Sequence, residues 1–305
     1  MDKILELMLE KVADLHGVPE GAYNIRANGQ TQSRNTTANI DIITREDGTG
    51  IDVHVKPGTK NESVHIPVIL SQTGLTELVS NDFYIGENAD VTIVAGCGIH
   101  NSGDQESRHD GIHRFFIGKN AKVRYVEKHY GDGDGRGGRI MNPRTEITIE
   151  EGGSMEMESV QIKGIDSTRR ETAARLKAGA KLVVQERLMT HGSQHAESRF
   201  DVHMDGENSS ANIISRSVAK DESEQMFYSN LVGNSLCAGH TECDAIIMGH
   251  ARISSLPEIT ANHPDAALIH EAAIGKIAGE QIVKLMTLGL SEEEAEAQIV
   301  NGFLK

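Results

Sequence analysis

Side chains that bind metals are concentrated between residues 237 and 271 of this 305-residue chain. Cysteine thiolate is the usual ligand of iron–sulfur clusters, and histidine can replace it at one iron. We expect Cys243 to lie in a strand, on the opposite side from Cys237. These residue types indicate a metal or cluster site, with a structural role for Cys243 as the alternative. The group comprises Cys237, His240, Cys243, His250, His263, His270 and Glu271.

A second group of candidate ligands lies in the middle of the chain. Cysteine and histidine together favour borderline and soft metals such as iron or zinc. If strands stack about one repeat apart, Cys97 or His100 would lie over His129. The alternative is a polar face with solvated histidines. This predicted second metal site consists of Cys97, His100, His109, His113 and His129.

The motifs of the common enzyme families are missing. No G-x-x-x-x-G-K-[ST] phosphate loop, G-x-S-x-G, H-E-x-x-H or paired C-x-x-C is present. Residues 133–138 (GDGRGG) formally fit G-x-G-x-x-G, but no helix is expected after them and the neighbouring aspartates would repel a pyrophosphate. Asp132 and Asp134 hint at a calcium turn but lack the full ligand spacing, so a flexible loop is favoured.

Composition narrows the class of protein. The formal net charge of −15 argues against a nucleic-acid surface, which needs clustered Lys and Arg. Three cysteines are too few for a disulfide framework. Because we find no apolar run of about 18 residues and no signal-peptide pattern, we expect a cytoplasmic protein with no membrane contact. The absence of Trp and the 31 Gly suit thin, repetitive layers.

A repeat positions the candidate ligands. A turn, a small residue, a polar residue and a strand recur from residues 86, 118, 150, 177 and 206, which are 32, 32, 27 and 29 residues apart. Alternating apolar and polar residues accompany it from about residue 37 to 250. Such spacing predicts a solenoid in which each coil buries its apolar face on the next. A β-sandwich with coincidentally similar turns is the alternative.

Helical patterns flank the repeat. Residues 2–16 carry apolar side chains at helical spacing and end at Gly17 and Pro19. A second helix is expected over residues 274–288, ending at Gly289, and Ser291 with Glu294 forms a capping box that opens a third. Such short helices are unstable alone and must pack on the solenoid or on a partner. The apolar residues expected to bind a partner are Ile277, Ile282, Leu285, Met286, Ile299 and Phe303.

Several segments, in their order along the chain, resemble the SufB/SufD family of the SUF iron–sulfur cluster assembly system. The resemblance is specific over about residues 230–305, weakens over 40–230, and is closest to a minimal, archaeal-type SufB-like member. The matching segments are 241–249 (TECDAIIMG), 256–258 (LPE), 269–273 (IHEAA), 279–281 (GEQ), 289–295 (GLSEEEA) and 299–303 (IVNGF).

The resemblance implies a mainly β fold, a right-handed parallel β-helix over residues 35–265. An N-terminal helical segment would occupy 1–34, and a short C-terminal helical segment 266–305. It also implies a non-enzymatic scaffold that works with a separate SufC-like ABC ATPase and passes its cluster to recipient apo-proteins. The missing phosphate loop fits that division of labour.

The resemblance assigns roles to three residues. Cys243 matches the SufB cysteine thought to accept sulfur and hold the nascent, transient Fe–S cluster. Glu271 matches the SufB glutamate after the histidine, and His270 matches the SufD histidine that completes the site between the two proteins. Because one chain carries all three, we expect a homodimer with Cys243 of one protomer near His270 of the other. Nitrogen and oxygen ligands suit release of the cluster.

The chain departs from the family in its cysteines, since only Cys97 and Cys237 accompany Cys243. We therefore expect direct use of sulfide rather than sulfur relay from a SufE-like donor. Two rival functions stay open. One is a SufD-like structural partner that holds no cluster of its own. The other is an enzyme, a solenoid lyase or a cupin-like metal oxygenase, that uses the Cys/His group at residues 97–129.

Overall fold

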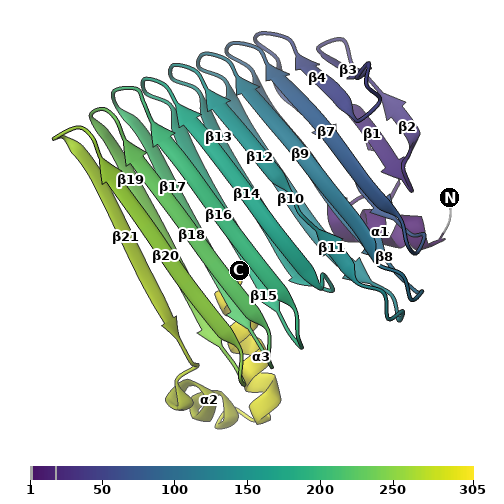
Figure 1. Ribbon diagram of the computed structural model, residues 1–305, viewed down its shortest axis with the longest axis vertical. Coiled ribbons are helices and arrows are strands. Elements are labelled where there is room, and N and C mark those ends of the chain that lie inside the picture. Colours follow the sequence, from purple (N-terminus) through teal and green to yellow (C-terminus); the bar gives the residue numbers. More distant parts are fainter. Residues whose placement is uncertain (1–2, 18) are drawn as a thin grey trace.

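Two mainly parallel β-sheets form a β-solenoid of about eight turns (Figure 1). The computed structural model describes residues 3–17 and 19–305. From residue 76 onward, the chain passes from one sheet to the other and back in each turn. The predicted mainly β solenoid with helices at both ends is confirmed.

We call the two sheets A and B. Sheet A contains β1 (Ala22–Ala27), β2 (Gln30–Asn35), β5 (Lys60–His65), β6 (Val68–Leu70), β8 (Asp90–His100), β10 (Lys122–Asp132), β13 (Ser154–Lys163), β15 (Lys181–Thr190), β17 (Ser209–Ala219), β19 (Cys237–Ile247) and β21 (Ala266–Gly275). Sheet B contains β3 (Ile40–Thr44), β4 (Ile51–Val55), β7 (Thr76–Ile85), β9 (Ser107–Ile117), β11 (Arg139–Met141), β12 (Arg144–Ile149), β14 (Ser167–Leu176), β16 (His195–Met204), β18 (Glu224–Gly233) and β20 (Arg252–Ala261).

The sequence repeat corresponds to the turn that precedes five strands of sheet A, namely β8, β10, β13, β15 and β17. The third residue of every repeat has a left-handed backbone conformation with positive φ, which glycine and asparagine adopt more readily than most residues. This shared requirement explains why the repeats look alike although their strands differ. The five residues are Asn88, Asn120, Gly152, Gly179 and Asn208.

The interior of the solenoid has an apolar part and a polar part. Alternate side chains of each strand point inward. In β10, Val123 and Tyr125 join the apolar core, whereas Glu127 and His129 are buried farther along the same strand. Buried polar side chains recur at corresponding places in later turns, so polar groups follow the interior from turn to turn.

Helix α1 (Lys3–Ala13) packs on the outer face of sheet A, over β8 and β10. Met8 and Val12 are fully buried there. The helix approaches so closely that a Cβ atom on Gly96 would lie 2.2 Å from the carbonyl oxygen of Val12. Glycine in this strand is therefore required by the contact with the helix.

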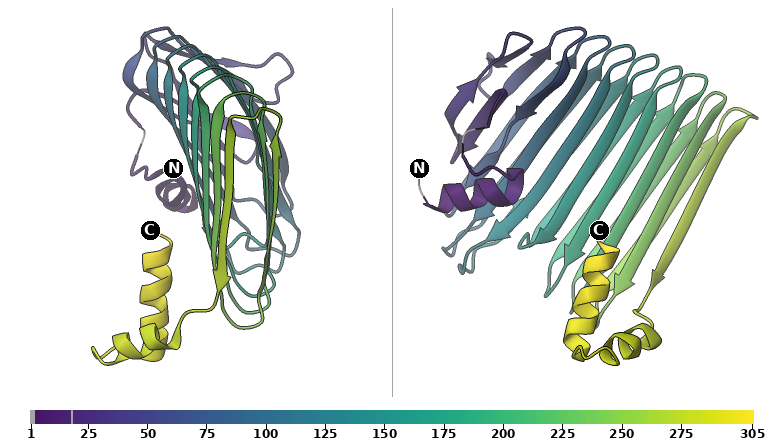
Figure 2. Two further views of the ribbon diagram at one scale, coloured as in Figure 1. Left: turned by 90° about the vertical axis from the view of Figure 1, so that its left-hand side faces the viewer. Right: turned by 180° about the vertical axis from the view of Figure 1, so that it is seen from behind.

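Helices α2 (Gly279–Met286) and α3 (Glu292–Phe303) follow the last strand, and the C-terminal end returns to the outer face of sheet A (Figure 2). Val300 and Leu304 pack on Val218 of β17. Ser291 and Glu294 form the predicted capping box of α3. In the described part of the chain, every helix is too short or too polar to cross a bilayer.

The segment boundaries differ in detail from those expected. Segment 1–34 contains α1 but also β1 and β2, and its residues 1, 2 and 18 lie outside the described residues. Segment 266–305 opens with β21, so Ile274 is in a strand and the helices begin at Gly279. Hydrogen bonding of β21 to β19 along its length extends the sheet through residues that the helical pattern had included.

Candidate functional site

Cys243 points into the solenoid from the middle of β19, which is the next-to-last strand of sheet A. Only 1% of its surface is exposed, and Thr241 and Ala245 on either side of it also face inward. Cys237 is buried on the same side, so the expected opposite orientation is wrong. The two cysteines are an even number of residues apart in a strand without a bulge, and such residues share a face.

Polar side chains of earlier turns lie next to Cys243 in the interior. Ser215 is its register partner on β17, and Glu186 is the register partner of Ser215 on β15. The Ser215 hydroxyl donates to Glu186 Oε2 at 2.7 Å, and the Ser198 hydroxyl donates to Oε1 of the same carboxylate at 2.6 Å. The thiol therefore lies at the end of a buried, hydrogen-bonded polar column.

This environment keeps the thiol protonated. The pKa of Cys243 is raised to about 11, chiefly by burial; the nearby Ser255 hydroxyl lowers this pKa, and the charges of Glu186 and Asp244 raise it. A thiol in an apolar or acidic environment is a poor nucleophile until its proton is removed. A metal ion can supply that activation by displacing the proton.

His270 and Glu271 are neighbours on β21 but face opposite sides of sheet A. His270 is the register partner of the inward-facing Thr241, and its Nδ1 lies 2.6 Å from the threonine hydroxyl. Burial, and then the proximity of His240, lower the pKa of His270, which favours the neutral, metal-binding imidazole. Glu271 is on the outer face, where its Oε2 lies 3.1 Å from His240 Nε2. Within one chain, Cys243 and His270 share a face and Glu271 does not.

The last turn of the solenoid is open. Strands β20 and β21 each end a sheet, so each has one edge without a neighbouring strand in the described chain. Ile259 of β20 stacks on the buried Leu231 yet is 43% exposed. Unpaired strand edges and exposed core side chains favour association with another chain.

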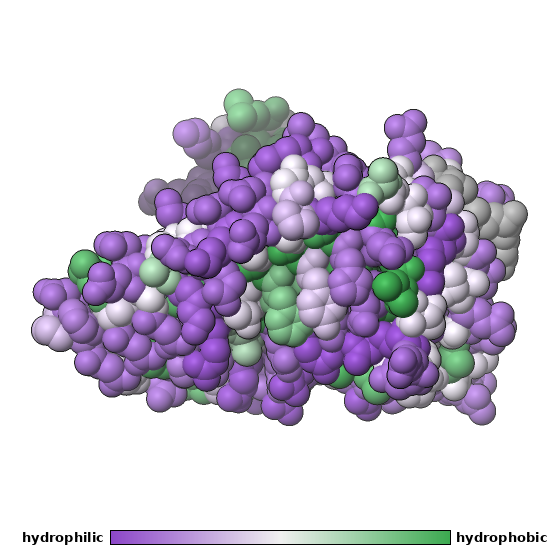
Figure 3. Space-filling view, turned by 90° about the horizontal axis from the view of Figure 1, so that it is seen from above, coloured by the Kyte–Doolittle hydropathy of each residue, from purple (hydrophilic) through white to green (hydrophobic). Residues whose placement is uncertain are grey.

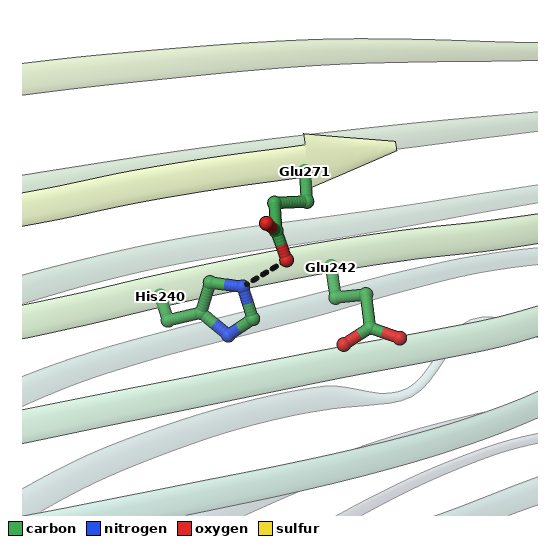
Figure 4. A group of neighbouring side chains, drawn as sticks. All are labelled: His240, Glu242 and Glu271. Carbon is green, nitrogen blue, oxygen red and sulfur yellow. Dashed lines mark hydrogen bonds and ion pairs between the residues drawn. The ribbon is translucent and has the colours of Figure 1, made fainter. Parts of the chain in front are cut away.

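A second set of possible ligands lies on the outer face beside Glu271. His240 and Glu242 project outward from β19, and their ligand atoms lie with that of Glu271 within 4.8 Å of one another (Figure 4). His240 belongs to the group of candidate ligands at residues 237–271, but Glu242 was not selected as a ligand from the sequence. Their spacing of two residues in a strand, combined with the register partner Glu271, is the signal that could have revealed the set.

The middle group of candidate ligands is largely inside the solenoid. The buried members are Cys97, His109, His113 and His129. Cys97 is the register partner of His129, so of the two residues expected to lie over His129, it is Cys97 that does. His100 instead pairs with Asp132 at the strand end. Among the described residues, this group does not bring three ligand atoms within 4.8 Å of one another. The second metal site therefore stays a prediction.

Hydrogen bonds already occupy several members of this middle group. His113 Nδ1 lies 2.6 Å from the Tyr125 hydroxyl, which donates to Glu127 at 3.1 Å. Arg170 forms an ion pair with Glu127 and contacts His129 Nδ1 at 3.0 Å. Burial lowers the pKa of His113 to about 4, so this imidazole is neutral at physiological pH.

The predicted partner-binding residues divide between packing and exposure. Ile277 and Phe303 pack on the small core beneath α3. Helix α2 buries no residue, and Met286 is 42% exposed. Ile282, Leu285 and Ile299 are half-buried. The apolar side of α2 is thus only partly covered by its own chain.

A cavity of about 490 Å³ lies on the outer surface of the first turns, away from all these ligands. It borders a stack of rings in which His54 and Phe116 lie on either side of Tyr84, with centroid separations of 4.7 and 5.1 Å. Seen from above, the surface is mostly hydrophilic with a hydrophobic strip across its middle (Figure 3). The cavity lining contains no cysteine and no residue of either ligand group, so the cavity is separate from the candidate site.

Comparison with known protein families identifies this architecture. The model of the family described as SUF system FeS cluster assembly, SufBD core domain, matches residues 74–303. The match runs from the turn before β7 to the end of α3. It therefore includes the strands of both sheets from β7 onward and all the candidate ligands discussed above.

Curated relatives carry related descriptions. An iron-sulfur cluster assembly SufBD family protein of Archaeoglobus fulgidus is 31% identical over 265 residues, 85% of this chain and 69% of the relative. A SufBD family protein of Methanocaldococcus jannaschii is 28% identical over 253 residues, 82% of this chain and 79% of the relative. The iron-sulfur cluster assembly protein SufB of Bacillus subtilis is 27% identical over 231 residues, 72% of this chain but 47% of SufB.

Proposed function

Because the chain belongs to the SufBD family of SUF-system iron–sulfur cluster assembly proteins, we propose that it is a non-enzymatic scaffold on which a nascent cluster is built. The observation that carries this proposal is the position of Cys243. Its thiol and the imidazole of His270 face the same interior at the open last turn of the solenoid. A thiolate and a neutral imidazole are both iron ligands in known clusters.

The scaffold functions as a homodimer in this proposal. Two chains meet through their open ends, so that Cys243 of one protomer approaches His270 of its partner. The unpaired edges of β20 and β21 and the exposed Ile259 support this arrangement, because pairing would satisfy the strands and cover the apolar side chain. Iron displaces the thiol proton, and the mixture of sulfur and nitrogen ligands permits later release to recipient apo-proteins.

A SufC-like ABC ATPase is the proposed partner of α2 and α3. The exposed apolar residues of α2, including Met286, supply a contact surface, and this chain has no phosphate loop of its own. ATP-driven closure of two such subunits would twist the dimer and open the interior site. The ATPase activity then belongs to the partner.

The test is anaerobic reconstitution with Fe²⁺ and sulfide, followed by the visible absorption of the cluster. Cys243→Ser should lose the chromophore, because the serine hydroxyl is a poor ligand for the cluster. Cys237→Ser is the matched control, since Cys237 is buried on the same face of the same strand, and it should keep the chromophore. A full chromophore in Cys243→Ser would contradict the proposal.

The structural-partner alternative has one observation in its favour, the burial that keeps the Cys243 thiol protonated. It predicts binding to the ATPase without iron or sulfide. The enzyme alternative, which uses the middle Cys/His group, predicts a single mononuclear metal and turnover of a small molecule. Total iron and acid-labile sulfide, measured on protein purified without oxygen, separate these alternatives: the scaffold contains both in similar amounts.

A further inference from the structure

Three ligating side chains converge on the outer face of sheet A, behind Cys243. His240 and Glu242 alternate along β19, and Glu271 joins them from β21 (Figure 4). One ligand atom from each lies within 4.8 Å of the others. Ligands of one first-row metal ion lie about 2.0–2.2 Å from it, so small rotations of these accessible side chains would bring all three to one ion.

The imidazole of His240 is oriented for a metal. Its Nδ1 lies 3.0 Å from Asn212 Oδ1, and since an amide oxygen only accepts, Nδ1 carries the donated hydrogen. The other nitrogen, Nε2, lies 3.1 Å from Glu271 Oε2, and a hydrogen must lie between these two atoms. A metal ion bound by both residues would replace that hydrogen. A second ring nitrogen anchored by a neighbouring acceptor is the usual arrangement of histidines that bind metals.

The charges around Glu242 favour a cation. Glu242 has a ligand atom within 4.8 Å of one of Glu271, and Asp244 lies two residues farther along the same outer face of β19. In residues 3–17 and 19–305, no Lys, Arg or His forms an ion pair within 4.0 Å of the Glu242 carboxylate. A bound cation would relieve the repulsion between these neighbouring carboxylates.

We propose that His240, Glu242 and Glu271 form a mononuclear site for a divalent transition metal, and that this site captures Fe²⁺ on the outer face of sheet A. One nitrogen and several carboxylate oxygens suit ferrous iron and disfavour soft monovalent copper. Glu242 precedes Cys243 in the chain, so captured iron lies on the reverse side of the same strand. The metal site stands on its own geometry, whereas its role in supplying iron rests on the proposed scaffold function.

The test measures Fe²⁺ binding to the metal-free full-length chain, without oxygen and without sulfide, by competition with a chromophoric chelator. The wild type should bind one Fe²⁺ per chain even with excess Mg²⁺, because imidazole favours transition metals. His240→Ala and Glu242→Gln should each weaken Fe²⁺ binding by more than about tenfold. Asn212→Ala should weaken it by about tenfold, because His240 Nδ1 loses the acceptor that orients the imidazole.

Two variants serve as controls. His203→Ala removes a comparable histidine–carboxylate pair, since His203 Nε2 lies 3.3 Å from Asp201 Oδ1, and it should leave Fe²⁺ affinity unchanged. Cys243→Ser should also retain Fe²⁺ affinity, because the thiol is on the other face. Unchanged binding in His240→Ala overturns the proposal. So does loss of binding in Cys243→Ser alone, which would assign the iron to the thiol.

The two proposals fail in distinguishable ways. If the wild type binds Fe²⁺ through His240 but forms no cluster when sulfide is added, the scaffold function fails and the outer metal site stands. If Cys243→Ser alone loses the cluster chromophore and His240→Ala binds Fe²⁺ normally, the scaffold function stands and the outer site fails.

Discussion

The thiol of Cys243 combines deep burial with an acidic neighbourhood. Its pKa of about 11 predicts that alkylation by iodoacetamide rises with pH up to about 11, because the reactive thiolate is formed only as pH approaches the pKa. At pH 8 this pKa leaves about 100-fold less thiolate than a cysteine with a pKa of 9.0 would have. Mass spectrometry of the Cys243 peptide across pH gives the profile, with the urea-unfolded chain as reference.

Burial also slows alkylation at every pH, since the reagent must reach a side chain that is 1% exposed. The midpoint of the profile is therefore the informative quantity, rather than the absolute rate. A midpoint in the native protein equal to that of the unfolded chain would contradict the environment described for Cys243.

Arg170 holds together the charged part of the interior. It pairs with Glu127 and lies 3.5 Å from Glu186, and all three side chains are almost fully buried. Arg170→Met would leave two buried carboxylates without their cation, so unfolding free energy should fall by about 3–5 kcal/mol. The neighbouring Arg169 faces solvent, and Arg169→Met should cost at most about 1 kcal/mol. Urea unfolding measures the free energy of unfolding of both variants. Equal losses in the two variants would contradict the special role of Arg170.

Strand geometry shows what residue spacing alone could not predict about the candidate ligands. Successive residues of a strand point to opposite faces, so His270 and Glu271 cannot both turn toward Cys243 from β21. In a helix they could lie about 100° apart, and the segment from residue 266 was expected to be helical. The same alternation in β19 brings His240 and Glu242 to the face of Glu271, which knowledge of the strand register reveals and residue spacing alone does not.

At the scale of elements, the glycines of β8 determine where α1 rests. A Cβ on Gly96 would meet the backbone of Val12, which cannot rotate away. Gly96→Val should therefore displace α1 and lower the free energy of unfolding by about 1–3 kcal/mol, as overpacking does. Hydrogen exchange should become faster in residues 3–13.

Thr92→Val is the matched control for this effect, because it places the same β-branched residue on the outer face of the same strand. Thr92 lies farther back along β8, before the glycines that contact the helix. Exchange in α1 should stay slow in this variant. If Gly96→Val also leaves exchange in α1 unchanged, the helix does not depend on the glycine.

The solenoid could be predicted from the sequence because its turns repeat. The strands at its two ends could not, because they form through pairing with residues distant in the sequence. Five coils share a local requirement for a left-handed residue, such as Asn88 or Asn120, and this requirement is visible in the sequence. Strand β21 exists because β19 offers it hydrogen-bonding partners, which the helical pattern of residues 274–288 does not reveal. The hairpin of β1 and β2 likewise depends on the edge of sheet A that it extends.

At the scale of the whole molecule, its two ends are unequal. The first turns end in the antiparallel pairs β1–β2 and β3–β4, and α1 lies over the outer face of sheet A nearby. The last turn has only the helices α2 and α3 on one side, and its interior continues to an open edge. Two chains that meet through the same surface, the last turn of each solenoid, form a closed pair, which limits assembly through this surface to two chains.

This argument predicts that Ile259→Asp will abolish dimerisation without unfolding the chain. Ile259 continues the interior stack beyond Leu231 but is 43% exposed, so a partner would bury it and a carboxylate there would be desolvated. Light scattering should give twice the 33.1 kDa chain mass for the wild type and the single mass for the variant. Ile162→Asp is the control, because Ile162 is 39% exposed but lies in the middle of the solenoid, and it should remain dimeric. A wild type that is monomeric both alone and with the ATPase would exclude the shared site, because Cys243 and the partner's His270 could then never meet.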